Sequence, residues 1–272
     1  MSDPSSKEEI ESVLIFGGSG GFGRAFAERF SEIGVSVTTS DVINGSDIQA
    51  NICVDPDVFL PALSGSDLIL LCLPEAPACQ VLKALDGRIE DKLVVDICSV
   101  KSVIADVAKS HCQENEYVTF HPMFGPDRPF TGSNGVFMPI REGFLSNTFR
   151  TRLESFGLNI IDTDVETHDR VTSLVQVATH AVLATFANLR LQYEVPEEMV
   201  QAFATPVFAE LDRVSQGMVS ENPELYHNIQ TANPWGDEAR AKLKLALHET
   251  LAELSSENPE ETQALFERVR RS

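Results

Sequence analysis

Short apolar runs separated by amphipathic stretches mark the first part of the chain. The runs that predict strands are residues 13–16, 35–39, 68–73, 93–97, 117–120, 136–140 and 158–161. Between the first two runs, Phe26, Phe30 and Ile33 recur at helical spacing. Continuous apolar strands connected by helices are typical of a parallel sheet buried on both faces. The pattern therefore predicts an α/β domain of the Rossmann type.

The pattern changes near residues 162–167, after which no further strand is indicated. Residues 168–192 predict one long helix, and residues 237–271 are rich in the helix-forming residues Glu, Lys, Arg, Leu and Ala. Prolines mark the boundaries of the helices between them; they are Pro196, Pro206, Pro223 and Pro234. We predict a flexible tail over residues 1–10, the α/β domain over 11–164 and an all-helical domain over 165–272.

Composition excludes several classes of protein. The 272 residues include 21 Lys and Arg against 41 Asp and Glu, a formal net charge of −20. This excess argues against binding nucleic acid or an anionic membrane surface, because both require clustered positive charge. No apolar run is long enough to span a bilayer, and the polar, acidic start lacks the pattern of a secretion signal. The five cysteines form neither a disulfide framework nor a CxxC metal pair, which predicts a cytoplasmic protein without a metal.

A glycine-rich segment follows the first predicted strand and precedes a predicted helix. Gly18, Gly20 and Gly23 fit the pattern GxGxxG in the context that dinucleotide binding requires. Glycines permit a tight turn and allow backbone N–H groups to approach a pyrophosphate, which the helix dipole also attracts. The residues predicted to bind the pyrophosphate are Gly18, Ser19, Gly20, Gly21, Phe22 and Gly23.

Asp41 stands 18 residues after Gly23, at the end of the second predicted strand. A carboxylate there accepts hydrogen bonds from the adenosine ribose and repels a 2′-phosphate, so we predict NAD rather than NADP. The other interpretation of Asp41 is an ordinary turn residue. Leu73 and Pro74, which end the third strand, are also predicted to contact the cofactor.

Two further segments follow predicted strands at the edge where ligands bind in open parallel sheets. Residues 96–101 read D-I-C-S-V-K, and residues 120–127 read F-H-P-M-F-G-P-D. A histidine with an ordinary pKa of ~6.5 is suited to accept a proton near neutral pH. His121 is the histidine of the second segment, although a histidine before a proline is more often structural than catalytic.

With these motifs the chain resembles the prephenate dehydrogenases of tyrosine biosynthesis, especially the type fused to chorismate mutase in enteric bacteria. The resemblance covers nearly the whole chain and includes the glycine loop, D-x-x-S-V-K and H-P-M-F-G-P. In the helical part it extends to H-D-R at 168–170, Gln176, His180, Thr205-Pro206 and E-L-Y at 224–226. It implies an NAD-dependent oxidoreductase that converts prephenate to 4-hydroxyphenylpyruvate by oxidative decarboxylation. It also implies a homodimer formed through the helical domain. Because the glycine loop begins almost at once, we expect no mutase domain.

The resemblance also implies roles for individual residues. His121 matches the catalytic base, and Ser99 matches a serine near the substrate hydroxyl and the nicotinamide. Ser99 could also cap a helix over residues 100–109. Lys101 could add positive charge to the substrate site or be an ordinary solvated lysine. His180, Gln176 and Tyr226 match substrate-pocket positions of the helical domain, whereas His168 and Asp169 are assigned to the start of the helix, where Asp favours the dipole.

One departure from the family pattern concerns the substrate carboxylate. The family places an arginine nine residues before the position of Tyr226, and this chain has Gly217 there. Arg213, one helical turn earlier, could reach the same anion. Alternatively, the pocket is reshaped for 4-amino-4-deoxyprephenate, with arogenate as a third choice of substrate.

Two other functions are open at the level of sequence. A non-catalytic NAD-binding sensor could keep this fold, although the intact His121 and Ser99 count against it. A hydroxyacid dehydrogenase with a helical second domain would carry a catalytic lysine on its long helix, and residues 168–192 contain none.

Overall fold

The computed structural model describes residues 9–271, which fold as two compact units that divide between His168 and Asp169. The predicted boundary at 164/165 falls four residues earlier, at the start of helix α6 (Val165–Thr172). Residues 1–8 of the predicted tail lie outside the described residues. The tail prediction was wrong for Ile10, which is 1% exposed and belongs to the core of the first unit.

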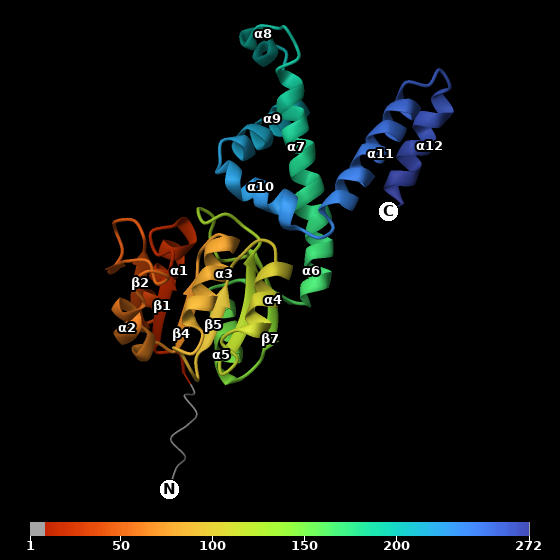
Figure 1. Ribbon diagram of the computed structural model, residues 1–272. Helices are drawn as coiled ribbons and strands as arrows, with labels where there is room; N and C mark the ends of the chain where they lie inside the picture. Colours follow the sequence, from red (N-terminus) through yellow and green to blue (C-terminus); the bar gives the residue numbers. More distant parts are fainter. Residues whose placement is uncertain (1–8, 272) are drawn as a thin grey trace. The chain divides into compact units, whose positions relative to one another are not determined.

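The first unit is built on one eight-stranded sheet with the order β3-β2-β1-β4-β5-β6-β7-β8 (Figure 1). The strands are β1 (Ser12–Phe16), β2 (Ser36–Asp41), β3 (Ile48–Gln49), β4 (Leu68–Leu71), β5 (Leu93–Asp96), β6 (Glu116–Pro122), β7 (Asn134–Arg141) and β8 (Asn159–Asp162). All neighbours are parallel except β6 and β7, which pair antiparallel. The prediction of a Rossmann-type α/β domain is confirmed, and the antiparallel pairing of β6 with β7 is the one feature of the described sheet that it did not include. Residues 123–133 form no helix, and a connection without a crossover returns the chain antiparallel.

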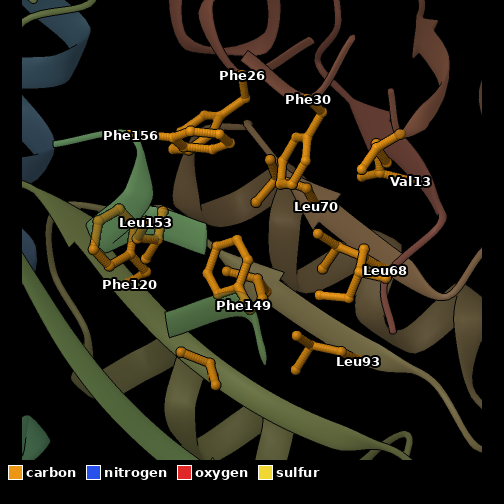
Figure 2. Close-up of a cluster of buried hydrophobic side chains, with 14 of the residues drawn as sticks. Val13, Phe26, Phe30, Leu68, Leu70, Leu93, Phe120, Phe149, Leu153 and Phe156 are labelled. Atoms are coloured by element: carbon orange, nitrogen blue, oxygen red, sulfur yellow. The ribbon is translucent and has the colours of Figure 1, made fainter. Parts of the chain in front are cut away.

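Helices cover both faces of this sheet, as the alternation of buried residues along the strands requires. In β1, Val13 and Ile15 face one apolar cluster, whereas Leu14 and Phe16 face the other. The first cluster is completed by α1 (Gly21–Glu32) and α5 (Phe144–Ser155), and Figure 2 shows its aromatic and aliphatic side chains. The second is completed by the 3₁₀ turn η1 (Pro56–Phe59), α2 (Leu60–Gly65), α3 (Glu75–Leu85) and α4 (Ser102–Ser110).

The described part of the second unit contains helices and no strand. After α6 come the π-helical segment η2 (Ser173–Ala178), α7 (Thr179–Arg190), α8 (Glu197–Ala202), α9 (Pro206–Val219), α10 (Pro223–Ala232), α11 (Gly236–Leu254) and α12 (Pro259–Arg270). Proline begins α9, α10 and α12, and the preceding Thr205, Asn222 or Asn258 caps each helix with its side chain.

The structure refines two helix predictions in this unit. The stretch 168–192 is helical but contains the π-helical segment, and residues 237–271 are helical as their composition indicates, divided between α11 and α12. α11 and α12 lie side by side (Figure 1), because Asn258 and Pro259 start a new helix after a short turn. Among the described residues, no helix combines the length and apolar character needed to cross a bilayer.

Candidate active site

The glycine loop is pressed against the neighbouring strands and leaves no room for side chains. Gly17 has φ +79°, and the N–H groups of Gly17 and Gly18 donate to the carbonyl of Ser40 at 2.8 and 3.0 Å. A Cβ on Gly18 would lie 2.6 Å from Thr39 Cβ, and one on Gly23 would lie 2.1 Å from the Gly17 oxygen. The first-turn N–H groups of α1, which have no intrahelical acceptors, begin at this loop. The loop is thus a cradle of backbone amides suited to a pyrophosphate.

Asp41 ends β2 and is tied to the same loop. One carboxylate oxygen accepts a hydrogen bond from the Ser19 N–H at 3.1 Å, and the other accepts one from the Val42 N–H at 2.7 Å. The Ser19 hydroxyl is 3.0 Å from the Ser46 hydroxyl, which ties the loop to the segment after β2. The sequence indicated a ribose contact for Asp41 but not this second task of holding the glycine loop.

The loops after β1 and β4 meet at the edge of the sheet where the strand order reverses, which is where ligands bind in such folds. A Cβ on Gly17 would lie 2.1 Å from the Cys72 carbonyl oxygen and 3.1 Å from Leu73 Cδ2. Pro74 follows as the N-cap residue of α3. The structure therefore brings Leu73 and Pro74 next to the glycine loop, as expected of residues that contact the same ligand.

The H-P-M-F-G-P segment is packed against the glycine loop and α1. A Cβ on Gly21 would lie 2.6 Å from Pro126 Cγ, and the rings of Phe22 and Phe124 meet edge to face at 5.7 Å. His121, in the same segment, lies in β6. The segment that carries the candidate base is therefore positioned directly on the segment that would carry the cofactor.

His121 is 3% exposed, and a hydrogen bond of 2.9 Å joins its Nδ1 to Nε2 of His168, which is also 3% exposed. Burial lowers the pKa of His121 well below its ordinary value, and the nearby Lys101 charge lowers it further. His121 is consequently neutral at neutral pH and able to accept a proton. The sequence placed His168 only at the start of a helix, and its proximity to His121 was missed.

Lys101 is fully buried, so it is not the solvated lysine that was the other interpretation, whereas its contribution of positive charge to the substrate site stays a prediction. Its Nζ is 3.0 Å from an Asp96 carboxylate oxygen and donates to the Phe120 carbonyl at 2.8 Å. Tyr117 donates from its hydroxyl to the other Asp96 oxygen at 2.8 Å, and burial raises the pKa of Tyr117 well above its ordinary value. Lys101 thus holds the backbone next to His121.

Ser99 is half-buried in the segment after β5, on the path from Asp96 to Lys101. It is not the N-cap that the sequence suggested, because α4 begins at Ser102 and Lys101 occupies the N-cap position. Its predicted place near the substrate hydroxyl and nicotinamide stays a prediction.

In the helical unit, His180 and Tyr226 come together from α7 and α10. Their rings meet edge to face at 4.9 Å. Burial lowers the pKa of His180, and its buried Nδ1 has no hydrogen-bond partner among the described residues. Tyr226 donates to Glu221 at 3.3 Å, and burial raises the pKa of Tyr226 to about 12. Gln176 is half-buried in the π-helical segment η2, a local geometry that occurs frequently at functional sites.

Arg213 and Gly217 lie one turn apart on α9. The Arg213 side chain is 67% exposed and pairs with Glu210 at 2.8 Å. A Cβ on Gly217 would meet no atom within 4 Å among the described residues, so the position is open. A substrate role for Arg213 would require it to leave Glu210, and it stays a prediction.

Two family models match the chain and together cover most of it. Residues 24–138 match the nucleotide-binding domain of prephenate dehydrogenase, and residues 164–268 match its dimerization domain. A 4-amino-4-deoxyprephenate dehydrogenase of Streptomyces pristinaespiralis is 29% identical over 269 residues, covering 94% of this chain and 89% of that protein. A Methanocaldococcus jannaschii protein named "Probable arogenate/prephenate dehydrogenase" is 26% identical over 231 residues. That match covers 82% of this chain, which spans about half the length of the archaeal relative.

Among solved structures, prephenate dehydrogenase of A. aeolicus in complex with hydroxyphenyl propionate and NAD+ has the same fold. The TM-score is 0.76 at 18% identity, and the match covers 97% of this chain and 98% of that chain.

Proposed function

Since this chain belongs to the prephenate dehydrogenase family, we propose that it oxidatively decarboxylates prephenate to 4-hydroxyphenylpyruvate with NAD as the hydride acceptor. The observation that carries the proposal is the position of His121. A buried histidine, kept neutral by burial, lies on a segment packed against a glycine loop of dinucleotide-binding form. This arrangement supports His121 as a base in the unit that would bind the cofactor.

The residues of the first unit fit NAD. The N–H groups of Gly18, Ser19 and Gly20 are bonded within the protein, so the amides offered to a pyrophosphate are those of the first turn of α1, from Gly21 to Gly23. Asp41 carries its carboxylate at the end of β2, where a 2′-phosphate would be repelled. When bound, the nicotinamide would accept a hydride from the substrate ring. The loop binds its anion through backbone groups, so it needs no basic side chain despite the net charge of −20.

His121 and Ser99 would manage the proton of the substrate hydroxyl. As hydride leaves the hydroxyl-bearing carbon, the hydroxyl proton moves to His121, which raises the rate by general base catalysis. The bond from the ring to its carboxylate breaks, its electron pair enters the ring, and CO2 departs. The aromatic ring oxygen then takes the proton back. Ser99, which can donate and accept at once, would orient the hydroxyl.

The second candidate substrate is 4-amino-4-deoxyprephenate. Gly217 stands where the family's arginine is expected, and its surroundings are open. The substrate carboxylate that this arginine would bind is therefore bound differently here, or the substrate itself differs. The S. pristinaespiralis relative, named for that substrate, matches along nearly the full length of both proteins. Arogenate is a third candidate. For each of them, His180, Gln176 and Tyr226 would line the substrate site from the helical unit.

We also propose a homodimer formed through the helical unit, because residues 164–268 match a dimerization domain and many large apolar side chains there are exposed. The excess of negative charge does not suit nucleic acid or anionic membranes as partners. All five cysteines are free, which supports the predicted cytoplasmic location.

The test of function is a comparison of initial rates with NAD and each of the three substrates, followed by the absorbance of the reduced nicotinamide. We expect turnover with prephenate and a preference for NAD over NADP. A higher kcat/KM for the 4-amino compound would reassign the substrate within the same mechanism. NAD binding without turnover of any of the three would favour the non-catalytic sensor.

A further inference from the structure

The buried contact between His121 and His168 joins two rigid elements of the first unit. His121 belongs to β6, where it pairs with Val136 of β7, and His168 belongs to α6. Their rings are inclined at 61° with centroids 5.1 Å apart, and the nitrogens are at hydrogen-bonding distance, 2.9 Å. Only one of the two facing nitrogens carries the hydrogen of this bond.

The backbone that carries each ring is held by independent contacts. The carbonyl of Phe120, the residue before His121, accepts a hydrogen bond from the buried Lys101 ammonium at 2.8 Å. On the other side, Asp164 caps α6: its carboxylate accepts the Thr167 N–H at 2.8 Å and the Thr167 hydroxyl at 2.7 Å. The His168 N–H donates to the Asp164 carbonyl at 2.9 Å. Together these contacts fix the backbone on both sides, and so the geometry in which the two rings meet.

The hydrogen bond decides which nitrogen of His121 can be the base. Because Nδ1 is occupied by His168, Nε2 is the nitrogen left for the substrate. A free lone pair on Nε2 requires that Nδ1 carry the hydrogen and donate it to His168 Nε2. His168 then has the task that a carboxylate has behind the histidine of a hydrolytic triad, which is to fix the tautomer and orientation of the base.

From this geometry we propose that His168 is the positioning residue of the base, holding His121 in the Nδ1–H tautomer and stabilising its transient imidazolium. The inference rests on the proposed function, in which a substrate proton moves to Nε2 of His121 as its O–H bond breaks. The electron pair stays on oxygen, and the Nδ1–H···Nε2 bond becomes charge-assisted and stronger. The proton returns to the ring oxygen after aromatisation, so the pair ends with the protons it began with.

The charges around the pair support this division of tasks. Burial disfavours a positive His121, and both the charge of Lys101, which is paired with Asp96, and any positive charge on His168 act in the same direction, so His168 can assist the base only while it is neutral. A protonated His121 therefore needs an acceptor that water cannot supply at 3% exposure, and His168 Nε2 is that acceptor. At neutral pH two adjacent imidazoles are not both in the positively charged imidazolium form, so the pair carries a single positive charge at most.

The first test uses two substitutions of different chemistry. His168→Phe keeps a ring but removes the acceptor, and we expect kcat to fall by about 10- to 100-fold with KM and the NAD Kd unchanged. His168→Gln offers an amide oxygen to Nδ1–H, and we expect it to restore most of the lost kcat. The matched control is His111→Gln, because His111 is a half-buried histidine bonded to Asp86 outside the site, and it should leave kcat unchanged.

The second test is independent of turnover. Nitrogen NMR of histidine-labelled protein, with the His121 signal assigned by its absence in His121→Asn, reports the tautomer directly. We expect Nδ1–H in the wild type and in His168→Gln, and a mixture of tautomers in His168→Phe. A wild type in the Nε2–H tautomer, or wild-type kcat in His168→Phe, would overturn the proposal. If no substrate is turned over, the proposed function fails, and the NMR still tests the hydrogen bond.

Discussion

The two units bury their apolar residues to very different degrees. In the first unit the apolar side chains form two large clusters, one on each face of the sheet, and rings such as Phe26, Phe30, Phe120 and Phe149 are completely buried. In the described part of the second unit, the buried apolar cluster consists of Val177, Ile229 and Ala239.

The exposed apolar residues show the same contrast. The second unit exposes large apolar side chains along nearly every helix, and α11 alone exposes Leu245, Leu247, Leu251 and Leu254. Large exposed apolar side chains that are contiguous mark an interaction surface. The first unit thus buries its own apolar residues, whereas the second leaves many exposed, which supports the proposed homodimer together with the match to a dimerization domain.

The candidate functional residues are also distributed differently between the two units. The glycine loop, Asp41 and the His121–His168 pair stand on strands and helix ends of the well-packed unit, which keeps reacting groups at fixed distances. The residues that depart from the family pattern, Gly217 and Arg213, lie on the thinly packed unit. We infer that the first unit determines the reaction and the second determines the substrate.

The largest effect is expected from the core of the first unit. Phe149→Ala should lower the free energy of unfolding by about 3–5 kcal/mol, because the ring is completely buried and meets Phe120 edge to face. The control is Phe144→Ala on the same helix, where the ring is 52% exposed and the loss should stay below about 1 kcal/mol. Urea unfolding measures both. Equal losses would mean that α5 is not packed as described.

The next effect concerns the exposed face of α11. Replacing both Leu247 and Leu251, one turn apart, with lysine should weaken dimerisation by at least about 2 kcal/mol, because two charges would enter an apolar interface. Glu249→Lys changes the charge by the same amount at a polar position and should leave dimerisation nearly intact. Analytical ultracentrifugation measures the dimer Kd of each variant. If the leucine variant associates like wild type, α11 is not part of the interface.

The third prediction compares one glycine of each unit. Gly23→Ala should weaken NAD binding and lower stability by about 1–3 kcal/mol, because its Cβ would lie 2.1 Å from the Gly17 oxygen. Gly217→Ala meets open space within α9 and should raise stability by about 0.5–1 kcal/mol. Calorimetric titration with NAD and thermal unfolding measure the two effects. Unchanged NAD affinity in Gly23→Ala would contradict the assignment of the loop.

The smallest effect is a pH dependence. Burial lowers the folded-state pKa of both His121 and His180, so the unfolded state binds a proton first as the pH falls. Their contribution to stability is present above a pH of about 6.5 and is lost on acidification, by up to about 1.4 kcal/mol per pH unit for each group. His121→Gln should flatten the decline between about pH 6.5 and pH 5. His180→Gln should flatten it less, since His180 is less buried. Identical slopes in wild type and His121→Gln would show that His121 is not kept neutral.

The sequence predicted the helices and strands better than it predicted how they pair and pack. The apolar runs located seven of the eight strands, but the two-residue strand β3 was missed because its surroundings are polar and short. The antiparallel direction of β7 was not predicted, because apolar runs do not report which way a strand pairs. The π-helical segment η2 was also unpredicted, since residues 173–178 have ordinary helical composition.

The same limit applies to the site. Motif spacing identified the glycine loop, Asp41 and His121 as candidates, because each depends on local sequence. The contact of His121 with His168 spans 47 residues, and the burial of Lys101 against Asp96 depends on how β5, β6 and α4 pack. The H-D-R motif at 168–170 drew attention to His168, but nothing in the spacing of the motif indicates that His168 contacts His121.

The central claim is that His121 accepts the substrate proton in a reaction that couples hydride transfer to loss of CO2. The most direct measurement follows reduced nicotinamide and CO2 together, in wild type and His121→Asn, at saturating NAD and prephenate. We predict equal amounts of both products from the wild type, and a kcat lower by about 10²- to 10⁴-fold in the variant with NAD affinity unchanged. Full turnover by His121→Asn, or reduced nicotinamide without CO2, would contradict the account.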